Sequence, residues 1–170
     1  MESQRITHPF PPLYDAHSEI LILGSFPSVK SREQQFFYGH PQNRFWRVTA
    51  AVFQENVPVA ISEKTAFLLR NHIALWDVIG QCDICGSSDS SIRNVMPNDL
   101  MPILQHAAIR RVFVNGGTAA KYYQKYQLPV TGIPAVQLPS TSPANAAWTL
   151  PKLIGAWQII RENEKNSIRL

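Results

Sequence analysis

Short runs of apolar residues alternate with longer segments whose apolar positions recur at helical spacing, and this pattern organises the chain. The runs are bounded by glycine, proline or small polar residues, which predicts strands buried on both faces. We expect four such strands, at residues 19–24, 73–78, 111–114 and 135–138. The segments with helical spacing predict helices at residues 45–57, 62–71, 98–107, 118–126 and 145–161, with Ser62 and Asn98 as caps.

The order of these elements predicts the fold class. Strands separated by helical segments of about ten or more residues are typical of right-handed crossovers in a parallel sheet. We therefore predict an α/β fold, a three-layer α/β/α sandwich with a central, mostly parallel four-stranded sheet, in a single domain over residues 1–170. Segment 81–95 is polar and rich in glycine and serine, and we interpret it as a long surface loop.

The loops that follow the predicted strands are the first candidates for a functional site. Ligands of open parallel sheets bind at the carboxyl ends of the strands. The four loops there are rich in small polar residues and begin near Gly24, Asp77, Asn115 and Leu138. The last loop, LPSTSPANA, offers hydroxyls and backbone amides beside two prolines, which suits a phosphate; an ordinary strand-to-helix connection is an equally good interpretation.

Segment 36–46, FFYGHPQNRFW, is the most distinctive part of the chain. Its glycine and its His-Pro step force a turn directly after three aromatic rings, so the rings cannot all be buried. An exposed ring on a stiff turn offers a flat apolar face to a planar ligand, such as a nucleobase. We assign Phe45 and Trp46 to the core, and the candidate site residues are Tyr38, His40 and Asn43.

Composition and charge narrow the class of protein only slightly. Hydrophobic residues make up 45% of the chain and charged residues 16%, as in an ordinary globular protein. No apolar run approaches the ~20 residues that span a bilayer, and the amino terminus lacks an apolar signal core, so we expect a cytoplasmic protein without membrane contact. Sixteen Lys and Arg against twelve Asp and Glu give a net charge of +4, which permits an anionic partner without requiring one.

The two cysteines, Cys82 and Cys85, form a single C-x-x-C motif. A zinc site or an iron–sulfur cluster needs four ligands, and the spacing does not favour His72 or His106 as the missing ones. A thioredoxin-like pair opens a helix, whereas a glycine and two serines follow here. We interpret the pair as two reduced cysteines in a loop, and we predict neither a metal nor a cofactor.

Three motifs together resemble the uracil-DNA glycosylase superfamily, most closely its hypoxanthine-DNA (deoxyinosine) glycosylase branch. They are GSFPS at 24–28, YGHPQNRFW at 38–46 and LPSTSPANA at 138–146, of which the middle one is specific. The HPxNRFW part also resembles the mismatch-specific uracil/thymine glycosylases. The resemblance implies a monomer that binds DNA containing a deaminated base, flips the nucleotide out of the stack and hydrolyses the N-glycosidic bond without a cofactor. Hypoxanthine is the expected base, with uracil and xanthine as further candidates.

The resemblance also implies a catalytic residue. Many members carry Asp or Asn two residues after the glycine of the first motif and His at the start of the last motif, but this chain has Phe26 and Leu138 there. In the deoxyinosine branch the Asn of the HPxN segment takes over the catalytic role. We therefore predict that Asn43 orients the attacking water, with its amide oxygen accepting a hydrogen bond from the water. A cap of the following helix is the alternative role for this residue.

The remaining roles concern the base and the DNA backbone. Tyr38 and Phe26 would sandwich or abut the flipped base. The predicted base-binding residues are Gly24, Ser25, Phe26, Tyr38, His40, Asp77 and Asn115. The predicted DNA-binding residues are Ser140, Thr141, Ser142, Asn145 and Lys121.

Two other functions stay open at this point. Because the usual catalytic positions are empty, the chain could be a non-catalytic reader of damaged or single-stranded nucleic acid on the same fold. A nucleotide hydrolase is a weaker alternative, since the sequence has no P-loop, no clustered carboxylates and no His pair.

Overall fold

Two β-sheets of different kinds organise the chain in the computed structural model, which describes residues 2–162. The larger sheet is parallel and four-stranded, in the order β3-β2-β6-β7. Its strands are β2 (Ile20–Gly24), β3 (Ile73–Asp77), β6 (Arg111–Asn115) and β7 (Ala135–Leu138). Every residue of β2 and β3 is buried, as expected for apolar strands covered on both faces. The α/β fold with a four-stranded parallel sheet is confirmed.

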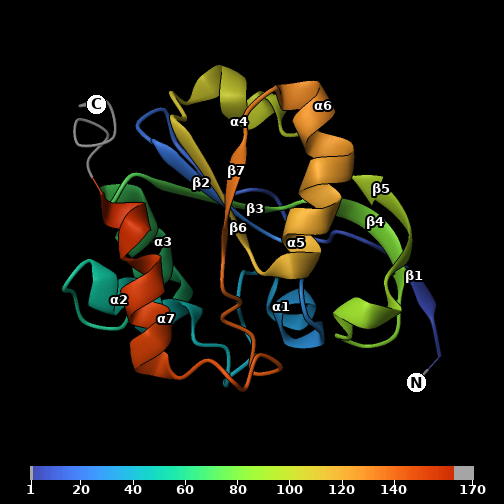
Figure 1. Cartoon of the computed structure of the whole chain (residues 1–170), viewed down its shortest axis with the longest axis horizontal. Helices are drawn as coiled ribbons and strands as arrows, with labels where there is room; N and C mark the ends of the chain where they lie inside the picture. The colour runs from blue at the N-terminus through green and yellow to red at the C-terminus, as the bar shows by residue number, and fades with distance from the viewer. Residues whose placement is uncertain (1, 163–170) are drawn as a thin grey trace.

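Helices lie on both faces of this sheet (Figure 1). Those on one side are α2 (Phe45–Val52), α3 (Ile61–Arg70) and α7 (Leu150–Trp157). Those on the other side are α5 (Gly117–Tyr122), the π-helical turn η2 (Tyr123–Gln127) and α6 (Leu128–Thr131). The remaining helical segments are α1 (Val29–Gln34), α4 (Met101–His106) and η3 (Gln158–Arg161). Within residues 2–162, none of the helices has the length and apolar character needed to cross a membrane.

The helices begin or end at other residues than predicted, and α2, α3 and α7 are examples. Helix α2 ends at Val52 instead of residue 57. Ser62 lies inside α3, whose first turn is closed by Glu63 accepting a hydrogen bond from the backbone N–H of Ala60 at 3.0 Å. Helix α7 begins five residues later than predicted, after Thr149, whose side chain accepts a hydrogen bond from the backbone N–H of Lys152.

The smaller sheet corrects the prediction that segment 81–95 is a surface loop. It is antiparallel, in the order β1-β4-β5, with strands β1 (Gln4–Thr7), β4 (Ile79–Ile84) and β5 (Arg93–Pro97). Only the connection between β4 and β5 is irregular, and it contains the short helix η1 (Asp89–Ser91). Cys82 is therefore a buried strand residue and not a loop residue, while Cys85 follows the strand and is half-buried; both thiols are free.

A single residue, Val78, separates β3 of the larger sheet from β4 of the smaller one. Asn98 closes this junction and does not cap α4 as predicted: its Nδ2 donates to the carbonyl oxygens of Asp77 at 2.8 Å and Ile79 at 3.1 Å. Gln127 adds hydrogen bonds to the carbonyl oxygens of Val78 at 3.1 Å and Asn98 at 2.8 Å. The junction fixes the second sheet beside the carboxyl end of β3.

Candidate active site

All four parallel strands end at one open pocket of about 760 Å³. Their last residues, Gly24, Asp77, Asn115 and Leu138, all line it. The predicted site residues that line the pocket are Gly24, Ser25, Phe26, Tyr38, His40, Asn43, Asp77, Asn115, Ser140, Thr141, Ser142 and Asn145. Lys121 lies outside the pocket lining, on the exposed side of α5, with its Nζ 5.2 Å from the centre of the Tyr122 ring.

Phe36 and Phe37 are buried, although Phe37 also lines the pocket, and Tyr38 is the partly exposed ring of the 36–46 segment that lines it. Its backbone has φ +51°, a left-handed conformation that is rare for an aromatic residue and is found at strained functional positions. One face of the ring stacks on Phe45, with the ring centres 4.1 Å apart. Burial, followed by the negative charge of Asp77, raises the pKa of the Tyr38 hydroxyl well above its usual range, so this hydroxyl is neutral.

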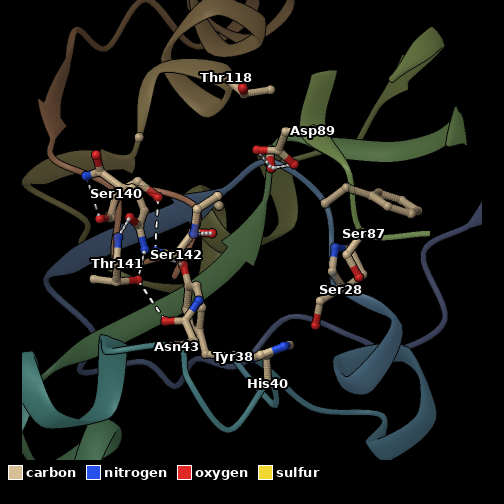
Figure 2. A pocket seen from close by; sticks show the side chains of 18 of the residues that line it. Ser28, Tyr38, His40, Asn43, Ser87, Asp89, Thr118, Ser140, Thr141 and Ser142 are labelled. Atoms are coloured by element: carbon tan, nitrogen blue, oxygen red, sulfur yellow. Dashed lines mark hydrogen bonds between the residues drawn. The ribbon is translucent and has the colours of Figure 1, made fainter. Parts of the chain in front are cut away.

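Asn43 stands at the end of a chain of hydrogen bonds that starts at Asn115 (Figure 2). Asn115 Nδ2 donates to Thr141 Oγ1 at 3.0 Å, and Thr141 Oγ1 donates to Asn43 Oδ1 at 2.9 Å. The backbone N–H of Phe45 donates to the same Oδ1 at 2.9 Å. Both lone pairs of Oδ1 are thus occupied, and the Nδ2 of Asn43 is the part of the amide left to meet a ligand. Thr141 is fully buried, so its hydroxyl supports Asn43 and does not face a DNA backbone.

Arg44, which the sequence did not single out, holds the loop 139–149 in shape. Its guanidinium donates to the carbonyl oxygens of Ser142 at 2.9 Å and Asn145 at 3.1 Å, and also to that of Trp148. A further contact of 3.4 Å joins Nε to the carbonyl oxygen of Thr141. The planar guanidinium group of arginine has five N–H donors and can bind several carbonyl oxygens at once, which the ammonium group of lysine cannot. The conformation of this loop is therefore set from the residue next to Asn43.

Small polar side chains on the same loop are tied to nearby backbone. Ser140 Oγ accepts from the backbone N–H of Ser142 at 3.1 Å, and Ser142 Oγ accepts from that of Ala144 at 3.2 Å. Asn145 Nδ2 donates to the Ser140 carbonyl oxygen at 3.0 Å. Because each serine hydroxyl serves as an acceptor in these bonds, its own proton is available to a ligand.

Asp89 faces Asn43 across the pocket and was also missed from the sequence (Figure 2). Ser25 Oγ donates to its carboxylate, at 3.0 Å from Oδ1 and 3.1 Å from Oδ2. Loss of water around the carboxylate raises the pKa of Asp89, and the charge of Asp77 adds to this, while hydrogen bonds from Ser25 and Thr118 act in the opposite direction. Asp89 comes from the connection between β4 and β5, so the second sheet contributes to the site.

Two histidines lie near the base-binding residues. His40, one of the predicted residues, lines the pocket and accepts a hydrogen bond from the backbone N–H of Gln42 at its Nδ1, 3.1 Å away, which stabilises its own turn. His8, which was not predicted, places its Nε2 2.7 Å from Asp77 Oδ2. Among residues 2–162, no three His, Cys, Asp or Glu side chains lie together as a metal site would require.

Comparison with known proteins places the chain in a family. A family model described as the uracil DNA glycosylase superfamily matches residues 11–161. The chain belongs to this superfamily. The resemblance carried by the three sequence motifs is thereby confirmed, and the superfamily match covers every pocket residue except Phe10.

Two curated relatives carry the name hypoxanthine DNA glycosylase. The protein from Methanosarcina acetivorans is 38% identical over 138 residues, which cover 80% of this superfamily member and 86% of the relative. The protein from Methanosarcina barkeri is 34% identical over 115 residues, which cover 66% and 73%. A solution NMR structure from M. acetivorans, described as a candidate uracil DNA glycosylase, matches with a TM-score of 0.76 at 32% identity, over 94% of this chain and 100% of that chain.

Proposed function

We propose that this member of the uracil DNA glycosylase superfamily removes hypoxanthine from DNA by hydrolysing the N-glycosidic bond of a flipped deoxyinosine. The observation that carries the proposal is the open pocket at the ends of the four parallel strands, lined by Asn43 on one side and by carboxylates on the other. The names of the curated relatives support hypoxanthine as the base. Uracil and xanthine are the alternative bases, since both also place a ring N–H beside a carbonyl.

The pocket suits a flipped purine nucleotide in size and lining. Its volume of about 760 Å³ lies in the range of small-molecule sites. Phe45 supports the Tyr38 ring from behind, so only one face of this ring is open to a base. Phe26 lines the same pocket, and its side chain is otherwise buried. These two rings would hold the base in a fixed plane, as predicted from the sequence.

Asn43 would act through its amide nitrogen. The predicted role, in which Oδ1 accepts a hydrogen bond from the attacking water, requires Asn43 to release Thr141 or the Phe45 backbone, because both already donate to Oδ1. A donor role for Nδ2 needs no such change. Negative charge develops on the base as the glycosidic bond breaks, and a fixed N–H donor stabilises that charge. The helix-cap role and the catalytic role therefore coexist, because they use different atoms of Asn43.

The DNA strand would be held by the loop 139–149 and by α5. The hydroxyl protons of Ser140 and Ser142 and the side chain of Asn145 are suited to phosphate oxygens. Lys121 would add a positive charge on the exposed side of α5. The monomeric state and the cytoplasmic location remain predictions from the sequence.

The decisive experiment is base release from labelled oligonucleotides that contain a single deoxyinosine, deoxyuridine or deoxyxanthosine, in single and double strands, followed by alkaline cleavage of abasic sites. We expect cleavage at deoxyinosine. Cleavage at deoxyuridine alone would reject hypoxanthine as the preferred base, and binding without any cleavage would favour the non-catalytic reader.

The catalytic assignment is tested in the same assay with Asn43→Ala. We expect excision to fall about 100-fold or more, because a fixed donor to developing charge contributes on this scale, while binding of the oligonucleotide persists. The matched control is Gln42→Ala, an exposed side chain on the same turn. Excision by Asn43→Ala at the parental rate would show that another residue carries the chemistry.

A further inference from the structure

His8 lies behind the pocket, against the pocket-lining Asp77, and directly follows β1 of the second sheet. Its side chain is 2% exposed, that of Asp77 is 7% exposed, and the distance from Nε2 to Asp77 Oδ2 is 2.7 Å. The backbone N–H of His8 donates to the carbonyl oxygen of Gly80 at 2.8 Å. The rings of Phe10 and Trp76 lie 4.6 and 4.3 Å from the imidazole, centre to centre. The ring is thus fixed in position and in orientation.

The hydrogen bonding of His8 also defines where its proton lies. Nδ1 is buried and is the only buried side-chain nitrogen or oxygen in residues 2–162 without a hydrogen-bond partner. A proton on Nδ1 would be a buried donor without an acceptor, which costs free energy. The proton of this pair therefore lies on Nε2, which donates it to Asp77 Oδ2, so this oxygen is occupied.

The other carboxylate oxygen of Asp77 faces the pocket floor. A Cβ atom on Gly24 would stand 2.5 Å from Asp77 Oδ1 and 3.2 Å from Tyr38 Oη, so glycine makes room for both. All three residues line the pocket, and within the described part of the chain no hydrogen bond reaches Oδ1. Oδ1 is thus an acceptor of fixed direction that a bound base would meet.

We propose that His8 is a positioning residue that fixes Asp77 so that Oδ1 accepts the ring N–H of a deaminated base. This inference rests on the proposed function. Deamination of adenine converts N1 from an acceptor into an N–H donor, as in hypoxanthine. Adenine would place its N1 lone pair against the carboxylate and leave both groups without a proton. The His8–Asp77 pair therefore selects the deaminated base over the normal one by the direction of a single hydrogen bond.

The role of His8 does not follow from the family match. The family model matches residues 11–161, and His8 lies before that range. Asp77 lies within the range, at the end of β3. The hydrogen-bonded pair therefore joins Asp77, inside the matched range, to His8, which lies outside it and directly follows β1.

The test compares His8→Gln with His8→Leu. Glutamine can place an N–H donor near the position of Nε2, whereas leucine fills a similar volume without a donor. We expect His8→Leu to lower deoxyinosine excision about 10-fold, the usual scale for one buried hydrogen bond to a charged group, and His8→Gln to recover most of it. In parallel, inhibition by free hypoxanthine should weaken in His8→Leu relative to inhibition by free adenine. Equal losses in both variants, or an unchanged preference for hypoxanthine, would overturn the proposal.

Two controls keep the result interpretable. Wild-type protein is first assayed on deoxyinosine, since absence of excision there rejects the proposed function. Binding of free hypoxanthine and adenine to wild type and both variants then still tests His8 independently of catalysis. Long-range proton–nitrogen NMR spectra of the wild type supply a measurement that requires no variant to fold. We expect the Nε2–H form of His8, and a proton on Nδ1 would contradict the assigned hydrogen bond.

Discussion

The two sides of the pocket differ in both origin and chemistry. On the β6 and β7 side, the amide side consists of Asn115, Thr141 and Asn43, linked by hydrogen bonds that end in a free N–H donor. On the β3 side, the carboxylate side consists of Asp77 and Asp89, held by His8 and Ser25. A base that donates a ring N–H to the carboxylate side and gains negative charge near the amide side would match both sides. The donor thus lies in the loop before α2 and is held from the ends of β6 and β7, whereas the second sheet contributes Asp89 and holds Asp77 through His8.

The largest expected effect comes from replacing the amide of Asn43 with a carboxylate. Asn43→Asp keeps an oxygen that can accept from Thr141 and from the Phe45 backbone, but it replaces the N–H donor with an anionic oxygen. We expect single-turnover excision of hypoxanthine to fall about 100-fold or more, because negative charge would now face the departing base. Activity near the parental rate would instead support the water-orienting role of the side-chain oxygen.

The next effect in size concerns how rigidly the amide side is held. Arg44→Ala removes the guanidinium that binds the carbonyl oxygens of Ser142, Asn145 and Trp148. We expect the free energy of unfolding in urea to fall by about 2–3 kcal/mol, since several charge-assisted hydrogen bonds are lost together. Arg44→Lys should recover less than half of this loss, because a single ammonium group cannot reach several carbonyl oxygens that lie apart. A full recovery by lysine would mean that charge alone stabilises the loop.

The smallest effect concerns the carboxylate side and depends on pH. The raised pKa of Asp89 means that the folded protein holds this proton at pH values where the unfolded chain has released it. Stability therefore falls as pH rises from the ordinary Asp pKa through the raised value of the folded state. We expect Asp89→Asn to lack this decline, which gives a difference below about 1 kcal/mol because the group borders open solvent. Urea unfolding of both proteins at acidic and neutral pH measures it, and parallel pH profiles would contradict the assignment.

The parallel sheet could be predicted because its strands are apolar runs ended by glycine, proline or small polar residues. The residues that end each run mark the ends of the strand in the sequence. Because the carboxyl ends of parallel strands lie at the same edge of a sheet, Gly24, Asp77 and Asn115 can be placed together without any contact information. The other side of the site could be predicted from the specific sequence motif around Asn43. The superfamily match confirms the class of enzyme, while the roles of the individual site residues stay predictions.

The second sheet could not be predicted because its strands have no comparable pattern. In β4 the buried residues are Ile79, Cys82 and Ile84, so the inward side does not follow a strict alternation, and the strand is irregular where it pairs with β5. Strand β1 is largely exposed and is a strand only because it pairs with β4. Since this sheet brings Asp89 to the pocket and His8 against Asp77, sequence patterns alone could not place them there.

The single residue between β3 and β4 also bears on how the pocket can adapt to DNA. Val78 leaves no linker in which a hinge could form, and its neighbours on both sides are bound to Asn98. We therefore expect Asp77 at the end of β3 and the start of the second sheet to move as one body when DNA binds, so that the carboxylate side of the pocket keeps its shape.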